Sequence, residues 1–237
     1  MNLFINDKPV KFIQTDKYLD LANQYSSVVD GKLTAVKAPL LKGHVLVVEP
    51  TVVLLYKIFT LMRVKKLKKL QSITFATANK KELVRAVKKH FKIIKAAGGI
   101  VSKDDRILLM YRLKKWDLPK GKLDKDEKSK IGAVREVEEE CNVKVKLEHK
   151  VCSTWHTYMQ NGNRIMKKTK WYAMTCLDDS AMKPQLEEDI EQLIWVDPEQ
   201  AKILLANSYH SINYVVDKYF QQQKALQEGN NNQVGWL

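Results

Sequence analysis

The chain has 237 residues, of which 45% are hydrophobic and 29% charged, and its formal net charge is +14. This length and composition are ordinary for a soluble globular protein and allow one large domain or two small ones. No apolar run approaches about 20 residues and the N-terminus lacks a signal peptide, so we expect no membrane association. The three cysteines, Cys141, Cys152 and Cys176, have no metal-ligand spacing and indicate reduced thiols in the cytoplasm.

The positive charge is concentrated in the first part of the chain. Residues 1–95 contain 19 Lys+Arg and 6 Asp+Glu, whereas residues 96–237 contain 22 and 21. This asymmetry predicts a separate N-terminal unit that binds a polyanion or an acidic partner. A basic surface that only keeps the protein soluble is the simpler alternative.

The N-terminal region alternates between strand and helix patterns. The order predicts a small α/β or α+β domain over residues 1–93, to which we assign no role. Its expected elements are a hairpin over residues 2–15, a helix over 16–24, a strand over 45–48, a helix over 50–61, a strand over 72–77 and a helix over 79–92 with Asn79 as its cap.

Two basic stretches lie in this region, a lysine run and the polar side of the 79–92 helix. They are Lys65, Lys66, Lys68 and Lys69, and Lys80, Lys81, Arg85, Lys88, Lys89 and Lys92. Such cations can bind nucleic-acid phosphates or attract a polyphosphate substrate. There is no helix-turn-helix, RNA-recognition or zinc-finger signature, so a solvated helix face is the leading alternative.

The second part of the chain has the pattern of a larger domain, residues 94–226, followed by a polar tail, residues 227–237. Its expected strands are 93–101, 107–111, 143–149, 151–159, 170–176 and 193–196, and its helices are one ending near 141, 198–206 and 209–224. Asp124 followed by Glu127 resembles a capping box at the start of the first of these helices.

Three glutamates fall on one face of that helix. Glu136, Glu139 and Glu140 are spaced i, i+3 and i+4, so their like charges repel. A divalent cation is a natural reason to keep them together, because Mg²⁺ and Mn²⁺ take oxygen ligands and recruit substrate phosphates. The alternative is an acidic face exposed to solvent.

The surrounding residues resemble the Nudix box, Gly-x5-Glu-x7-Arg-Glu-U-x-Glu-Glu-x-Gly-U, where U is a bulky aliphatic residue. The matching positions are Gly121, Glu127, Arg135, Glu136, Val137, Glu139, Glu140 and Val143. Asn142 stands where the family has Gly, just past the helix end. Asn tolerates a left-handed backbone better than other residues, so this departure should be mild.

The resemblance implies an α/β fold, the Nudix-type α/β/α sandwich with a mixed sheet. It also implies hydrolysis of a nucleoside diphosphate linked to another group, with Mg²⁺ or Mn²⁺ as cofactor. Carried over by position, Glu136 and Glu140 are metal ligands, and the backbone carbonyl of Lys120 completes the shell. Glu139 is another ligand or the general base, and Arg135 orients the carboxylates. Glu127 is expected to cap the helix and pair with Arg135.

Further site residues are expected outside the box. Glu188, or its neighbour Glu187, is the candidate for a second acid on a later loop, and solvated loop charges are the alternative. Candidate substrate-binding residues are Arg112, Lys120 and Lys122 for phosphate, and Trp116 and Tyr158 for stacking on a base. Both aromatic residues are equally typical of a core, and His156 is either a base or a structural histidine.

The substrate is inferred from one loop. Residues 116–127, WDLPKGKLDKDE, are similar to the Leu-Pro-Lys-Gly run of Nudix enzymes acting on diadenosine polyphosphates and diphosphoinositol polyphosphates. We therefore favour a dinucleoside polyphosphate, with a diphosphoinositol polyphosphate, a (d)NTP or an RNA 5′ end as alternatives. The alternative hypothesis is a non-catalytic regulator that binds nucleotides or nucleic acid. A homodimer is compatible with the sequence.

Overall fold

The computed structural model describes residues 1–17, 23–32, 36–64 and 67–231, and it divides the chain into two compact units. The first unit comprises Met1–Ile94 and Trp155–Lys167, and the second comprises Lys95–Thr154 and Lys168–Leu237. Of the helix expected over residues 16–24, residues 18–22 lie outside the described residues, and Thr15–Lys17 forms a 3-10 turn. The end of the expected tail, residues 232–237, also lies outside them.

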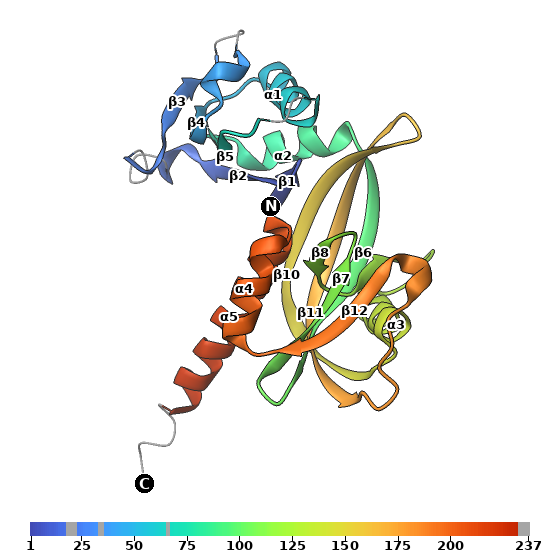
Figure 1. The fold of residues 1–237 in the computed structure, drawn as a ribbon. Helices are drawn as coiled ribbons and strands as arrows, with labels where there is room; N and C mark the ends of the chain where they lie inside the picture. Colours follow the sequence, from blue (N-terminus) through green and yellow to red (C-terminus); the bar gives the residue numbers. More distant parts are fainter. Residues whose placement is uncertain (18–22, 33–35, 65–66, 232–237) are drawn as a thin grey trace. The chain divides into compact units, whose positions relative to one another are not determined.

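The first unit is built on a mostly parallel sheet with strand order β3-β4-β5-β2-β1 (Figure 1). β1 forms an antiparallel hairpin with β2, and the other neighbouring strands are parallel. The elements are β1 (Asn2–Ile5), β2 (Lys8–Gln14), β3 (Ser27–Asp30), β4 (Gly43–Val48), α1 (Val52–Val64), β5 (Leu70–Thr77) and α2 (Lys80–Lys89). Strand β3 was not expected, since only four residues form it at the sheet edge.

Aromatic side chains form the centre of the first unit's core. Phe75 on β5 lies 5.5 Å from the ring of Phe12 and 6.1 Å from that of Phe59 on α1. Trp155 and Met166, from the tip of a long hairpin, join the same cluster. Asn79 precedes α2 but makes no capping bond; its amide donates to Glu82 instead, at 2.8 Å.

The second unit contains the remaining elements, with strand order β12-β7-β6-β11-β10 (Figure 1). They are β6 (Lys92–Lys103), β7 (Arg106–Arg112), β8 (Lys115–Asp117), β9 (Lys120–Lys122), α3 (Ser129–Cys141), β10 (Lys144–Gln160), β11 (Asn163–Asp178), β12 (Ile190–Val196), α4 (Pro198–Leu204) and α5 (His210–Asn231). The two strands expected over 143–149 and 151–159 are one continuous strand, β10. The far ends of β10 and β11 are the hairpin tip that belongs to the first unit.

Helices cover both faces of this sheet, which confirms the expected α/β/α fold class. Successive residues of β7 point to opposite faces, so Leu108 packs in the cluster beneath α3 while Ile107 and Leu109 pack in the cluster beneath α4 and α5. A strand buried on both faces explains why this segment is a continuous apolar run.

Several helix boundaries differ from expectation: the helix expected over residues 79–92 ends at Lys89, and Lys92, expected on its polar side, is the first residue of β6. α3 begins at Ser129, so the predicted capping-box start at Asp124 is wrong; Glu127 instead accepts the Asp124 N–H at 3.0 Å in a turn before the helix. α5 continues to Asn231, beyond the expected end at residue 224. Among the described residues, no helix is long and apolar enough to span a membrane.

The start of α4 provides a test of the fold. Asp197 accepts the Gln200 N–H at 2.8 Å, and the Gln200 side chain accepts the Asp197 N–H at 3.3 Å, which completes a capping box. Asp197→Ala should therefore lower the free energy of unfolding by about 1 kcal/mol, measured by urea denaturation. Glu199→Ala, on the same turn but exposed, is the control, and equal effects from both variants would contradict a role for the cap.

Candidate active site

Helix α3 packs one side against the sheet, and one charged residue of the box, Glu140, is buried with that side. Ala133, Val137 and Cys141 are fully buried against the sheet. Gly132 allows this close packing, because a Cβ there would lie 2.4 Å from the Leu123 side chain. The helix ends at Asn142, whose φ of 51° and ψ of 46° are left-handed, the conformation in which Asn replaces Gly most readily.

The guanidinium of Arg135 gathers three carboxylates. It lies 2.9 Å from Glu127, 3.0 Å from Glu136 and 2.8 Å from Glu139. The hydrogen bonds from Arg135, aided by the Asp124 N–H, lower the pKa of Glu127 to about 2. The hydrogen bond with Glu127, and then that with Glu139, raises the pKa of Arg135 above its usual range, so the Glu127–Arg135 pair is charged at neutral pH. Arg135 thus removes the repulsion that the box sequence creates.

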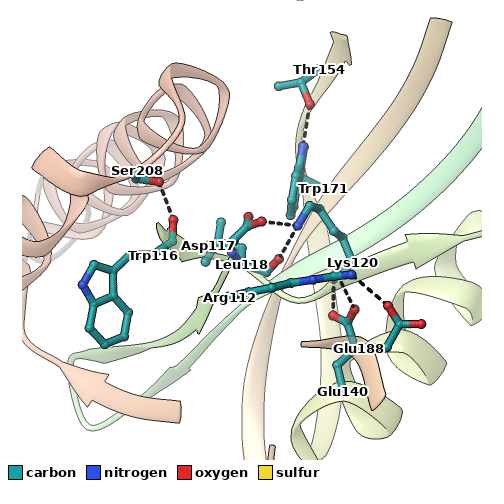
Figure 2. Close-up of polar contacts among 10 residues, drawn as sticks. All are labelled: Arg112, Trp116, Asp117, Leu118, Lys120, Glu140, Thr154, Trp171, Glu188 and Ser208. Carbon is teal, nitrogen blue, oxygen red and sulfur yellow. Dashed lines mark hydrogen bonds and ion pairs between the residues drawn. The ribbon is translucent and has the colours of Figure 1, made fainter. Parts of the chain in front are cut away.

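Glu140 is the deeply buried carboxylate of the site. Only 3% of the residue is exposed, and its Oε2 accepts the backbone N–H of Lys120 at 2.7 Å. Burial raises its pKa to about 7, although Lys120 and Arg112 act in the opposite direction. The hydrogen bond also holds the Lys120 peptide beside the α3 carboxylates (Figure 2).

Arg112 connects Glu140 to a residue far along the chain. One nitrogen of its guanidinium lies 3.6 Å from Glu140, and the other donates to Glu188 at 2.9 Å (Figure 2). The connection is possible because β12 pairs with β7, which places Ile190 opposite Arg112. The structure therefore links the sequence-predicted Glu188, through Arg112, to one α3 carboxylate, Glu140.

The loop before the box is held by an acidic residue that was not predicted from the sequence. Asp117, which is 5% exposed, forms an ion pair with Lys120 and accepts the Leu118 N–H at 2.8 Å. Lys120 also donates to the Leu118 carbonyl at 3.3 Å (Figure 2). The spacing of Asp117 three residues before Lys120 could have predicted this ion pair. The Lys120 ammonium, expected to bind phosphate, is therefore engaged within the loop.

The two predicted stacking residues are not gathered with the carboxylates. Trp116 is 9% exposed and lies in the core beneath α4 and α5, with its carbonyl bonded by Ser208 at 2.6 Å. Tyr158 belongs to the hairpin tip of the first unit, where it stacks on His156 with ring centroids 5.6 Å apart. Lys122 is exposed on β9, and its carbonyl accepts a bond from Arg135 at 3.3 Å.

The side chains suit a hard divalent cation, although they do not form a closed cage. Among the described residues, no group of three or more His, Cys, Asp or Glu side chains is close enough to hold a metal by itself. Glu136 nevertheless fits tightly against Gly121, where a Cβ would lie 1.7 Å from its Oε2. Carboxylates with a backbone carbonyl nearby are the donors that Mg²⁺ and Mn²⁺ prefer, with remaining positions left to other oxygens.

The comparisons with known proteins agree with this geometry. The NUDIX domain model matches residues 92–218, which is more than half of the chain, so the chain belongs to the NUDIX family. It is a hydrolase of that family, whose members generally require divalent metal ions.

Solved structures with a similar fold include a NUDIX hydrolase from Nitrosomonas europaea, at 17% identity and a TM-score of 0.46, covering 55% of this chain and 90% of that one. An Ap4A hydrolase from C. elegans, solved as a binary complex, matches at 20% identity and a TM-score of 0.43, covering 56% of this chain and 98% of that one.

The contact at Gly121 predicts a sensitive position. In Gly121→Ala the new methyl group displaces the Glu136 carboxylate, and a misplacement of about 1 Å can lower an enzyme's rate by as much as about 100-fold. We expect at least about a 10-fold loss in the rate of hydrolysis with the fold retained by circular dichroism. Gly162→Ala is the control for a methyl group that meets no neighbour within 4 Å; its φ of 75° should cost stability but leave the rate of hydrolysis unchanged. An unchanged rate in Gly121→Ala would contradict the assigned position of Glu136.

The buried Glu140 predicts a pH-dependent stability without metal. Its folded pKa of about 7 lies above the ordinary 4.5, so its contribution to stability is present below pH 4.5 and is lost as the pH rises through 7. This difference corresponds to about 3 kcal/mol. In EDTA, Glu140→Gln should therefore stabilise the protein more at pH 8 than at pH 5, measured by urea denaturation. Glu187→Gln, on an exposed loop, is the control; a gain that is equal at both pH values would count against the raised pKa.

Proposed function

We propose that this protein is a Mg²⁺- or Mn²⁺-dependent pyrophosphohydrolase whose favoured substrate is a dinucleoside polyphosphate. The observation that carries the proposal is that two ion-pair networks, built from residues distant in sequence, both include carboxylates of helix α3. Arg135 collects Glu127, Glu136 and Glu139, while Arg112 connects Glu140 to Glu188. Both networks lie in the NUDIX domain.

Glu136, Glu140 and the Lys120 carbonyl are the proposed metal ligands, with Glu139 as a further one. When bound, the divalent cation supplies positive charge that offsets the negative oxygens around the phosphorus. The protein prepares this position in two ways. Glu140 is held in place by the Lys120 N–H, and Glu136 is held between Arg135 and Gly121. The raised pKa of Glu140 supports the assignment, because a buried carboxylate gains from a nearby cation.

Glu139 is the proposed general base. Its side chain is 51% exposed, so it can reach water, and Arg135 holds it at 2.8 Å. In the reaction a water oxygen forms a bond to phosphorus, the bridging P–O bond breaks, and the Glu139 carboxylate takes the proton from the water. Glu188, 50% exposed and held by Arg112, is the second candidate for this step.

Substrate preference is proposed from the charges around the site. Arg112 has a buried Nε without a hydrogen-bond partner among the described residues, so its guanidinium is not saturated by Glu140 and Glu188. The Arg112 side chain is 23% exposed, so its Nη groups can also donate to a phosphate chain. Exposed Lys122 lies on the strand that follows the Asp117–Lys120 loop. A diphosphoinositol polyphosphate, a (d)NTP or an RNA 5′ end carries the same chemistry and is the alternative.

We further propose a cytoplasmic location, supported by the three free cysteines. The proposed partner of the NUDIX domain is a phosphorylated small molecule. A homodimer also stays a proposal.

Replacement of the base gives a direct test. Glu139→Gln should lower kcat at least about 100-fold while the protein stays folded, because general base catalysis contributes at least that much. Glu138→Gln is the matched control, as Glu138 lies on the same helix but pairs with Lys144 at 3.5 Å. Near-normal turnover by Glu139→Gln, together with a large loss in Glu188→Gln, would transfer the role of base to Glu188.

A substrate panel tests the reaction itself. Diadenosine tetraphosphate, a diphosphoinositol polyphosphate, dNTPs and 5′-triphosphorylated RNA would each be incubated with Mg²⁺, Mn²⁺ or EDTA, in ¹⁸O-labelled water. Mass spectrometry of the products identifies the bond broken and the phosphorus attacked. Fastest turnover of diadenosine tetraphosphate is expected, and no hydrolysis of any compound would favour a module that binds without turnover.

A further inference from the structure

The whole net charge of the protein resides in the first unit. By sequence this unit contains 20 Lys+Arg and 6 Asp+Glu, whereas the second unit contains 21 of each. The charge separates between the two structural units more completely than between the two parts of the sequence. The reason is that the hairpin tip adds Arg164 and Lys167, and no acidic residue, to the first unit. A net charge of this size on about a hundred residues gives a strong positive field around one unit only.

The hydrogen bonds to Glu49 and Glu82, two of the six acidic residues of this unit, come from neutral groups. Glu49 accepts bonds from the Thr15 hydroxyl and the Ala78 N–H, and Glu82 accepts a bond from Asn79. These hydrogen bonds stabilise loops, and the bond from Thr15, with a smaller contribution from the charge of Lys32, lowers the pKa of Glu49. Six acidic residues cannot balance 20 basic ones, so most of the positive charge of this unit is available to an external partner.

Arg63, in the last turn of α1, has unusually poor partners for a guanidinium. It donates to the Met159 sulfur at 3.2 Å and to the Thr60 hydroxyl at 3.5 Å, and its buried Nε has no partner among the described residues. A thioether is a weak acceptor, and buried charged donors are normally paired. Burial, and then the nearby Arg164, lower the pKa of Arg63.

Arg164 approaches from the hairpin tip and carries the same charge. It lies on the same hairpin tip as Met159, the residue that Arg63 contacts, and its charge also acts on the pKa values of Arg63 and Tyr56. Tyr56 in turn contacts the exposed His90 with its ring tilted by 51°, and the two ring centroids are 4.1 Å apart. Arginine side chains bind phosphates, and aromatic side chains stack on the bases of single-stranded nucleic acids, so this cluster contains both kinds of residue.

The adjacent helix extends the basic surface. The Tyr56 hydroxyl donates to the Ala86 carbonyl of α2 at 2.9 Å, so α2 lies directly beside this cluster. In ten residues, about 15 Å of helix, α2 has one acid and five cations, which are Lys80, Lys81, Arg85, Lys88 and Lys89. A surface of this length suits a chain of phosphates better than a single small anion.

We propose that Arg63 and Arg164 bind neighbouring phosphates of a single-stranded nucleic acid that continues along the basic face of α2. The proposal is independent of the hydrolase chemistry, since it concerns only residues of the first unit. The position of Arg63 at the C-terminus of α1 is favourable for a cation through the helix dipole. That effect accounts for a positive charge at this point, but not for the second arginine beside it.

The test measures binding of the full-length protein in EDTA, where hydrolysis is not required. A fluorescently labelled single-stranded RNA of 20 uridines is the probe, and anisotropy is followed at several salt concentrations. Arg63→Gln/Arg164→Gln should weaken binding at least about 10-fold and reduce the slope of log K against log salt by about 1.4, or 0.7 for each lost phosphate contact. Arg63→Lys/Arg164→Lys should recover most of the slope.

The matched control removes the same charge elsewhere in the first unit. Lys37→Gln/Lys42→Gln changes two exposed cations and should weaken binding less than about 3-fold. Thermal denaturation establishes that all variants are folded. The proposal is overturned by equal losses in the two glutamine pairs, by absence of binding at low salt, by a preference for duplex RNA of the same length, or by displacement of the RNA by tripolyphosphate at equal phosphate concentration.

Discussion

The active-site region depends on one arginine that holds three carboxylates in place. Arg135 lies within 3.0 Å of Glu127, Glu136 and Glu139, which would repel one another without it. The ion pairs join the helix to the turn before it, because Glu127 also accepts the Asp124 N–H. These ion pairs stabilise the charged face of α3 without a bound metal ion or substrate.

A second arginine links this helix to the rest of the domain. Arg112 reaches buried Glu140 on one side and Glu188 on the other, so a strand, a helix and a late loop share one network. Glu140 also accepts the Lys120 N–H, and Asp117 holds the Lys120 side chain. Glu140 and Glu188 are thus each held by residues from other elements, which is how a catalytic group keeps a fixed geometry.

Local patterns and tertiary contacts differed in how well they could be predicted. The i, i+3, i+4 spacing of Glu136, Glu139 and Glu140 places them on one helix face wherever that helix packs. The start of α3 at Ser129 was missed because the Asp124 and Glu127 pattern of a capping box also fits a turn closed by Arg135. Asp117 was missed because its partner, Lys120, was interpreted as a ligand for phosphate.

The sequence by itself determined the NUDIX family, the α/β/α class of the second unit and the carboxylate face of α3, because these follow from spacing along one chain segment. The tertiary structure decided which charged residues from distant segments form contacts. Pairing of β12 with β7 brings Glu188 to Arg112, and the tip of the long hairpin places Met159 against Arg63 in the basic first unit. Such meetings depend on strand register and on packing between segments about a hundred residues apart, which no local pattern specifies.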